Sequence, residues 1–330
     1  MKRRVQFSAA RILLGATILL AMVLFATWIY IAQPSFRSNA PTEFEIEANR
    51  LKRHVTALSR EFHPRNHAEV ENLEAAAQYI EGHFRGAGAK LSSQDCSIGE
   101  RTYRNVIGTI GAGKGGKIII GAHYDSCADT PGADDNASGV AGLIELAYLF
   151  GADPPDREIE IVAYTLEEPP YFGTERMGSF RHAEATAAAT EAVVGVIVLE
   201  MIGYFSNEPG SQGYPSIFLS LMYPNRGNFI AVVGNLGQRS FTKAVKVGMK
   251  GTTDLPVYSL NAPSIVPGVD FSDHRNYWPY GIDAVMITDT AFYRNKAYHT
   301  MGDTAGRLNC EAMADVTAAV YEAVLGISEP

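Results

Sequence analysis

The chain has 330 residues, of which 46% are hydrophobic and 19% charged, a composition typical of one large globular domain or two small ones. Its formal net charge is −8, and because basic residues in positions 1–11 contribute +4, the remainder carries −12. Such an acidic chain is not expected to bind nucleic acid. Its three cysteines include no CxxC pair, which argues against a thiolate zinc site, and spacing alone does not decide whether Cys96 and Cys310 pair.

The N-terminal segment differs from everything that follows. A basic arm over residues 1–11 precedes an almost wholly apolar run over residues 12–32, which is about the length that crosses a bilayer as a helix. A cleavable signal peptide has a shorter apolar region and a small-residue cleavage site. The weak candidate at 38–40 is followed by Pro41. We therefore expect an uncleaved anchor that contacts the lipid bilayer through residues 12–32, with a cleaved signal as the alternative.

The charges around this segment predict its orientation. Basic residues flank the cytoplasmic side of membrane helices, and aromatic residues such as Trp28 and Tyr30 gather at the interface. The N-terminus is therefore expected in the cytoplasm, and the rest of the chain outside it, in the periplasm if the organism is a bacterium. Residues 33–43 are predicted to form a linker and residues 44–330 a single domain.

Helical and strand patterns then alternate along the domain. Apolar spacing predicts helices over 44–62, 70–84, 138–150, 241–249 and 311–325, and strands over 105–110, 117–124, 158–166, 193–201, 216–222 and 284–288. This alternation favours an α/β fold, a three-layer α/β/α sandwich around a mixed, largely parallel sheet, preceded by one transmembrane helix.

The sequence gives no support for three familiar functional motifs. Residues 111–117 have the spacing of a phosphate-binding loop, but Ile118 and a strand follow where Ser or Thr and a helix are needed, so a hairpin turn is expected. His63 and His67 lie four residues apart, but Pro64 replaces the glutamate of a zinc-protease helix, so a loop is expected. The sequence contains no G-x-S-x-G motif of serine hydrolases.

Polar residues gather at three predicted strand ends. His123 closes one strand, Glu167 and Glu168 follow another, and Glu200 lies at the end of a third. Ligand sites in open α/β sheets form at the carboxyl ends of strands. Adjacent carboxylates, which otherwise repel, become favourable when two divalent ions lie between them, and paired ions can share and activate one water molecule.

These motifs in order resemble peptidase family M28, the zinc metallopeptidases that include dizinc aminopeptidases. The matching segments, from about residue 51 to the end, are GAHYDS, GADDNASG, TLEEPP, LEMIGY, FSDH and YHTMGDT. The resemblance implies two Zn²⁺ ions per chain. His123 and Glu200 would bind one ion, Glu168 and His299 the other, and Asp134 would bridge both. Many relatives have aspartate where Glu200 stands.

The resemblance also implies catalytic roles. Glu167 would be the general base, and Asp125 would fix the ring of His123. The peptide bond between Asp134 and Asp135 would be cis. His274 is left open between a role at the site and packing. An oxyanion donor is left open among four tyrosines, Tyr171, Tyr204, Tyr277 and Tyr298.

The expected function is that of a membrane-anchored, zinc-dependent exopeptidase, an aminopeptidase that takes peptides or small proteins with a free N-terminus. Cleavage from the carboxyl end remains an alternative within the fold. A single-zinc glutaminyl-cyclase-like acyltransferase is a second alternative. A non-catalytic, receptor-like binding domain is the third, which the full set of ligand types disfavours.

Overall fold

The computed structural model describes residues 2–35 and 38–328. Within these residues an eight-stranded sheet has the order β1-β2-β4-β3-β5-β8-β6-β7. Strands β4, β3, β5 and β8 run parallel, while β2 is antiparallel to β1 and β4, and β6 is antiparallel to β8. The strands are β1 Lys90–Ile98, β2 Arg101–Ile110, β3 Lys117–His123, β4 Glu158–Tyr164, β5 Val193–Glu200, β6 Ile230–Gly234, β7 Val257–Asn261 and β8 Ala284–Thr288.

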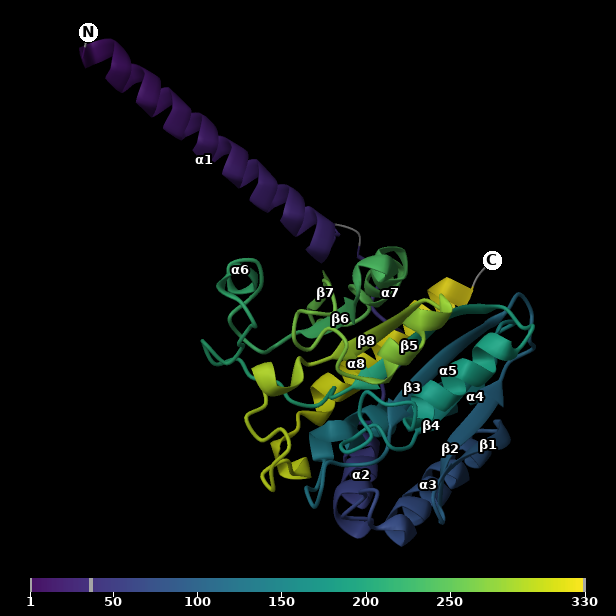
Figure 1. The fold of residues 1–330 in the computed structure, drawn as a ribbon. Coiled ribbons are helices and arrows are strands. Elements are labelled where there is room, and N and C mark those ends of the chain that lie inside the picture. The colour runs from purple at the N-terminus through teal and green to yellow at the C-terminus, as the bar shows by residue number, and fades with distance from the viewer. Residues whose placement is uncertain (1, 36–37, 329–330) are drawn as a thin grey trace.

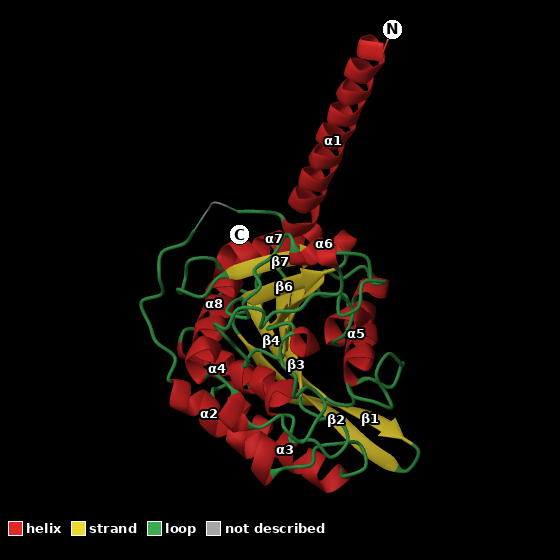
Figure 2. Cartoon of the chain, turned by 90° about the vertical axis from the view of Figure 1, so that its left-hand side faces the viewer, coloured by secondary structure: helices red, strands yellow, loops and turns green. Residues whose placement is uncertain are grey.

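Helices cover both faces of this sheet (Figure 2). The helices are α1 Lys2–Ala32, α2 Ala48–Thr56, α3 Val70–Gly86, α4 Gly139–Ala152, α5 Gly178–Ala188, α6 Ile217–Ser220, α7 Arg239–Met249 and α8 Cys310–Ser328. The main core lies between the sheet and α2, α3, α4, α7 and α8. A smaller core on the other face includes Ala183 of α5 and Tyr277. The predicted three-layer α/β fold is confirmed.

The central strands explain why the sequence forms this sheet. Every residue of β3 is buried, and β5 is an apolar run that is buried from Gly195 to its end. Strands covered on both faces need such continuous apolar runs, because the helices that pack on the two faces exclude water from both. The loops at the carboxyl ends of these strands are thereby held on a rigid base.

Several sequence predictions about individual elements are wrong. Residues 216–222 were predicted to be a strand, but they contain α6, because the Ser216 hydroxyl caps the turn by accepting from the N–H of Leu219 at 3.3 Å. The turn at 111–117 does not close a hairpin, because β4 lies between β2 and β3. Strand β1 was missed because its residues are mostly polar and half exposed at a sheet edge. All three cysteines are free thiols.

Helix α1 extends from the domain as a separate rod (Figure 1). Within Ala9–Ala32 an 18-residue window has a mean hydropathy of 2.5, and none of that window is buried in the protein. In this span only the last residue, Ala32, is buried against the domain. Length and composition therefore suit a membrane span, although a signal sequence meets the same test.

The close packing of the central strands can be tested at Gly121 of β3. A Cβ atom there would overlap the buried ring of Tyr164 on β4, which cannot move because its hydroxyl pairs with Tyr277 at 2.6 Å. We expect Gly121→Ala to lower the free energy of unfolding by about 1–3 kcal/mol, measured by denaturant titration.

The control for this experiment is Gly82→Ala, on the exposed side of α3, where nothing lies within 4 Å of the added atom. It should leave stability unchanged or raise it by up to about 1 kcal/mol, because alanine favours helix. Equal stability of the two variants would contradict the packing of β3 on β4.

Candidate metal centre and active site

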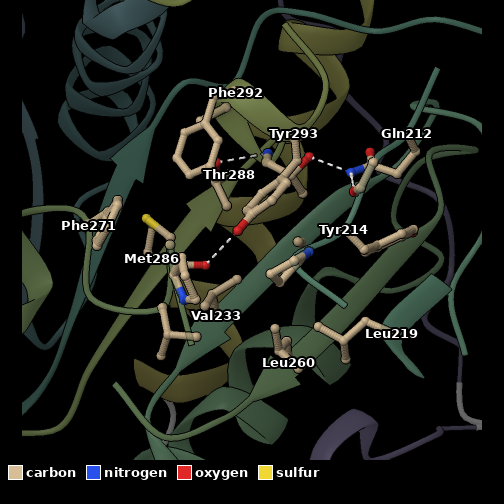
Figure 3. A pocket seen from close by; sticks show the side chains of 18 of the residues that line it. Gln212, Tyr214, Leu219, Val233, Leu260, Phe271, Met286, Thr288, Phe292 and Tyr293 are labelled. Carbon is tan, nitrogen blue, oxygen red and sulfur yellow. Dashed lines mark hydrogen bonds between the residues drawn. The ribbon is translucent and has the colours of Figure 1, made fainter. Parts of the chain in front are cut away.

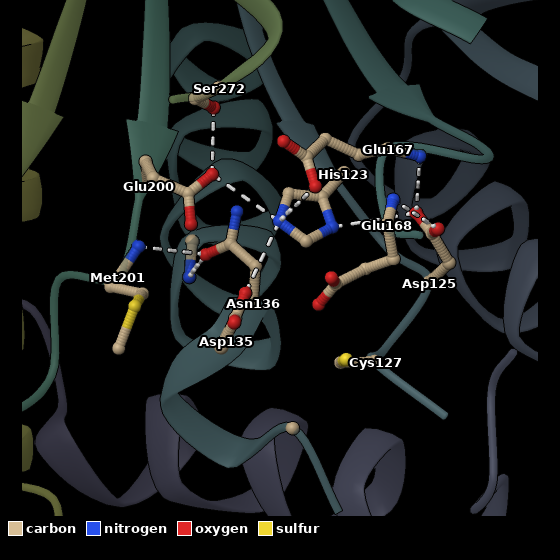
Figure 4. A network of polar contacts seen from close by, with 12 residues as sticks. His123, Asp125, Cys127, Asp135, Asn136, Glu167, Glu168, Glu200, Met201 and Ser272 are labelled. Carbon is tan, nitrogen blue, oxygen red and sulfur yellow. Dashed lines mark hydrogen bonds and ion pairs between the residues drawn. The ribbon is translucent and has the colours of Figure 1, made fainter. Parts of the chain in front are cut away.

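The carboxyl ends of three neighbouring strands meet at one edge of the sheet. Strand β3 ends at His123 and β5 ends at Glu200, while Glu167 and Glu168 lie just after β4. Because β3 is parallel to both β4 and β5, these residues leave the sheet on the same side. Figure 4 shows Glu167 and Glu200 directed toward the ring of His123.

His123 faces two carboxylates. Its Nε2 lies 3.3 Å from Oε2 of Glu200 and 3.4 Å from Oδ1 of Asp135. All three side chains are buried, and their ligand atoms are close enough together to hold one metal ion.

A second group lies at the other oxygen of Asp135. Nε2 of His299 is 3.0 Å from Oδ2 of Asp135 and 3.2 Å from Oε2 of Glu168. The thiol of Cys127 lies within 4.8 Å of the ligand atoms of Glu168 and His299. One carboxylate, that of Asp135, therefore presents its two oxygens to two different histidines, which is the geometry of a bridging ligand.

The position between the two histidines belongs to Asp135, and the prediction that Asp134 bridges the ions is wrong. Asp134 accepts hydrogen bonds from the Gly203 N–H at 3.0 Å and from the Asn295 amide at 2.8 Å. The backbone leaves helical values at Asp135 (φ −105°, ψ 89°), so the adjacent side chains take different directions. The expected cis peptide bond is also one residue later, between Asp135 and Asn136.

Hydrogen bonds hold the turn that carries Asp135. The Asp303 carboxylate accepts from the N–H groups of Asp134 at 3.0 Å and of Asp135 at 3.1 Å. The Asn136 side chain donates to the carbonyl of Leu199 at 2.8 Å, which ties the turn to the end of β5. The turn and the strand that carries Glu200 are thus fixed relative to each other.

A buried arginine that the sequence reasoning missed holds the preceding loop. The Arg65 guanidinium donates to the carbonyls of Tyr124 at 2.9 Å, Pro131 at 3.0 Å and Gly132 at 2.9 Å. It lies in the segment 63–67, which is a loop as predicted. Nothing in the local pattern marks Arg65 as buried, since all of its acceptors except the carbonyl of Leu58 come from distant parts of the chain.

Asp125 supports both His123 and the two glutamates. Its Oδ1 lies 3.4 Å from Nδ1 of His123. Its two oxygens accept from the N–H groups of Glu167 at 3.1 Å and Glu168 at 3.0 Å. Glu167 Oε2 lies 3.9 Å from Nε2 of His123, farther than the carboxylates of Glu200 and Asp135.

The crowded carboxylates shift one another's proton affinity. Burial, with the neighbouring Glu168 and Glu200, raises the pKa of Glu167 well above its usual range, although His123 opposes this. Burial and Asp135 raise the pKa of Glu168 to about 8. Burial alone would raise the pKa of Asp135, but the neighbouring imidazole rings of His123 and His299 hold it well below its usual range.

These residues fit metal ions. Both ring nitrogens of His123 and Oε1 of Glu168 are buried without a hydrogen-bond partner among the described residues. Buried polar atoms without partners are costly, and a set of imidazole nitrogens and carboxylate oxygens suits zinc. Divalent ions between these carboxylates would remove the repulsion and satisfy Nε2 of His123, whereas Nδ1 of the same ring faces Asp125.

Two side chains left open by the sequence can now be placed. Tyr298 stacks on His299, with ring centroids 3.7 Å apart. His274 is buried against Trp278, and its Nε2 lies 2.9 Å from the carbonyl of Val269, so it packs in the core. Ser272, which sequence reasoning did not single out, donates to Oε2 of Glu200 at 2.7 Å.

An apolar cavity of about 100 Å³ adjoins the polar cluster, with Glu200 and Tyr298 in its wall. Figure 3 shows aromatic and aliphatic side chains from separate segments around it. Its walls include Tyr214, Leu219, Val233, Leu260, Phe271, Met286 and Phe292. The site therefore combines a charged centre with a pocket for one apolar group.

The chain matches a known protein family. Residues 105–324 match the model of peptidase family M28. The chain belongs to this family. It is 45% identical over 319 residues to "Uncharacterized protein YfbL" of Escherichia coli K12, and the alignment covers 94% of this chain and 96% of that protein. It is 28% identical over 220 residues to "Aminopeptidase YwaD" of Bacillus subtilis, covering 64% of this chain and 42% of that protein.

Solved M28-type structures share the fold. A zinc aminopeptidase from Bacillus subtilis superposes with a TM-score of 0.66 at 16% identity, covering 86% of this chain and 95% of that one. A glutaminyl cyclase from Bacteroides thetaiotaomicron superposes with a TM-score of 0.64 at 19% identity, covering 87% and 99%. The fold alone therefore does not separate peptidase from cyclase. The family relationship supports Zn²⁺ as the metal of this site.

The assignment of Asp135 can be tested against its neighbour. We expect zinc-loaded, full-length protein to lose its zinc on Asp135→Ala, because Asp135 contacts both histidines of the site, and to keep it on Asp134→Asn. Burial, with Asp289 and Asp303, raises the pKa of Asp134 well above its usual range, so a neutral amide is a close substitute. Elemental analysis measures the zinc, and circular dichroism confirms folding. Retention of zinc by Asp135→Ala with loss in Asp134→Asn would restore the original prediction.

Proposed function

We propose that this M28 protein is an aminopeptidase that binds two zinc ions and is held in a membrane by α1. The observation that carries the catalytic proposal is the placement of Asp135 between His123 and His299, with one further carboxylate beside each histidine. One ion would be held by His123, Asp135 and Glu200, and the other by Asp135, Glu168 and His299. Zinc held by these residues would polarise a scissile carbonyl and lower the pKa of a bound water.

Glu167 is the proposed general base. It is buried beside His123 but lies outside both ligand groups, and its raised pKa suits a group that takes a proton and passes it on. It would accept a proton from the attacking water and give it to the leaving amine. Asp125 is a positioning residue, because it fixes the backbone of Glu167 and faces the ring of His123.

Tyr298 is the proposed hydrogen-bond donor to the substrate carbonyl oxygen. It borders both the apolar cavity and His299. Burial and the carboxylates of Asp135 and Glu168 raise its pKa far above its usual value, so it keeps its proton. Tyr277, by contrast, lies in the smaller core with its hydroxyl bonded to Tyr164 and His182.

The cavity beside Glu200 is the proposed site for the first side chain of the substrate. Its aromatic and aliphatic walls favour a large apolar residue, and its volume suits one side chain. The acidic groups around it, with Glu200 nearest, would attract the positive charge of a free N-terminus. The substrate class is therefore peptides with a free amine and a large apolar first residue.

Helix α1 is proposed to remain on the mature chain and to anchor it in the membrane. The N-terminus would then lie in the cytoplasm and the catalytic domain outside it. The apolar length and the basic arm support this proposal. Mass spectrometry of protein extracted from membranes is expected to give the uncleaved mass. A chain that begins after residue 32 would show a signal peptide instead.

The role of Glu167 predicts a specific loss. Glu167→Gln removes the base but no proposed zinc ligand, so kcat should fall by about 10²- to 10⁴-fold while zinc content is unchanged. Hydrolysis of a chromogenic leucine amide measures kcat. Near-normal kcat in this variant would exclude Glu167 as the base, whereas loss of zinc would show that it is a ligand.

The cavity predicts the substrate preference. Wild-type protein should release leucine or phenylalanine from free peptides and should not act on the same peptides after N-terminal acetylation. Val233→Phe, which fills the cavity from β6, should lower kcat/KM for these residues by about 10-fold, with alanine peptides affected less. An equal loss of kcat/KM for peptides with large and with small first residues would show that the cavity does not bind the first side chain.

The same peptide assay separates the alternatives. A cyclase would convert an N-terminal glutamine to a ring and release ammonia, with about one zinc per chain. A carboxypeptidase would release the last residue instead of the first, and a binding domain would leave every peptide intact. Any of these three outcomes would overturn the aminopeptidase proposal.

A further inference from the structure

We propose that α6 and the basic side of α7 form a second membrane-contacting surface, which seats the catalytic domain on the bilayer that holds α1. This inference rests on the proposed anchor and extends it from a tether to a fixed orientation. The occupant of the surface is the lipid interface on the outer side of that bilayer.

The first observation is that the end of α1 is fixed to the domain. Lys246 of α7 donates through Nζ to the carbonyl of Ala32 at 3.0 Å and to that of Gln33. Arg239 donates to the carbonyl of Tyr30 at 3.0 Å, and its guanidinium lies 3.7 Å from the centre of that ring. These contacts set the direction of α1 relative to the domain.

The second observation is an exposed apolar turn beside this junction. Ile217, the first residue of α6, and Leu221, the residue after it, are each 81% exposed. Among the large apolar residues described outside α1 only Ile265 is more exposed. A cavity lined by Trp28, Met222 and other residues joins the end of α1 to the segment just after α6. Exposed apolar side chains next to a membrane-spanning helix have a natural partner in the lipid interface.

The level of α6 along α1 supports the same conclusion. Trp28 and Tyr30 mark the position where α1 would leave the bilayer. Figure 1 shows α6 level with the last turns of α1, and Figure 2 also places it beside that end of the helix. A membrane that surrounds α1 up to its aromatic residues would therefore reach Ile217 and Leu221.

The third observation is a local reversal of charge. Helix α7 and the residue after it carry Arg239, Lys243, Lys246 and Lys250, although the chain as a whole has a net charge of −8. Lys243 is exposed and Arg239 and Lys250 are half-buried, while Lys246 is buried against the end of α1. Burial and then the neighbouring Lys250 and Lys243 lower the pKa of Lys246 to about 8, as expected when cations are crowded. Basic groups beside a membrane span favour anionic headgroups.

This orientation has a consequence for the substrate. Residues Tyr214, Leu219 and Tyr223, which flank or belong to α6, also line the apolar cavity beside Glu200. The segment that contacts lipid would thus form one wall of the substrate pocket. Peptides whose apolar N-terminus lies at the membrane surface would reach the pocket most readily, which deepens the proposed aminopeptidase function.

Fluorescence quenching in nanodiscs tests this surface in the full-length chain. The discs contain brominated phosphatidylcholine and phosphatidylglycerol, and the parent protein carries Trp28→Phe and keeps Trp278, whose emission in the parent is subtracted. The indole introduced by Leu221→Trp is expected to be quenched several-fold more strongly than that introduced by Glu100→Trp. Glu100 lies in the turn between β1 and β2, at the sheet edge opposite β7 and α1.

The outcomes separate the inference from the proposals beneath it. Strong quenching of Trp28 in the unmodified protein, with equal quenching of the two variants, would overturn the seated orientation and leave the anchor intact. Removal of α1 from the mature protein would overturn both. Neither result depends on peptidase activity, which is measured separately.

A paired substitution provides a functional readout. Ile217→Ser with Leu221→Ser should lower the rate on a peptide tethered to lipid by its carboxyl end by about 5-fold or more, and leave the rate on the same soluble peptide unchanged. Equal rates on tethered peptide for variant and parent would overturn the proposed effect of this surface on substrate access.

Discussion

The arrangement of this protein depends on one electrostatic constraint, a cluster of carboxylates buried around two histidines. Asp135 lies between His123 and His299, and Glu168 and Glu200 complete the two groups. Buried like charges are unfavourable unless opposite charges lie between them. The rest of the fold can be understood as the frame that holds these groups together until metal ions neutralise them.

That frame is built from distant segments. The parallel strands β3, β4 and β5 end at the same edge of the sheet and place site residues there. Asp303, from the loop before α8, accepts hydrogen bonds from the backbone N–H groups of Asp134 and Asp135. Arg65 holds the loop that precedes this turn. Most of these supports are hydrogen bonds to backbone groups, so they fix the direction of side chains without competing for metal.

The two other features of the molecule meet at α6. The apolar cavity beside Glu200 is lined partly by the segment that carries α6, and the same segment lies next to the end of α1. If the domain is seated as proposed, the membrane would restrict which peptides approach, while the cavity would select among them. Specificity would then arise from location as well as from pocket shape.

The sequence by itself determined the fold class, the family and most of the residues at the site. Continuous apolar runs identify β3 and β5 because a buried parallel strand needs apolar residues on both faces, and the polar residues that follow mark the ends where a site can form. Edge strand β1 and short helix α6 escaped prediction, because a half-exposed strand and an exposed apolar turn lack a clear period.

Only the tertiary structure decided between Asp134 and Asp135. The sequence does not distinguish two adjacent aspartates in a turn. Their directions depend on hydrogen bonds that their backbone N–H groups donate to Asp303 and that the Asp134 carboxylate accepts from Gly203 and Asn295. The role of Arg65 was not visible for the same reason, since the carbonyls of Tyr124, Pro131 and Gly132 that it holds lie 59 to 67 residues farther along the chain. Local composition sets which residues are available for chemistry, whereas long-range hydrogen bonding sets which of them face the metal.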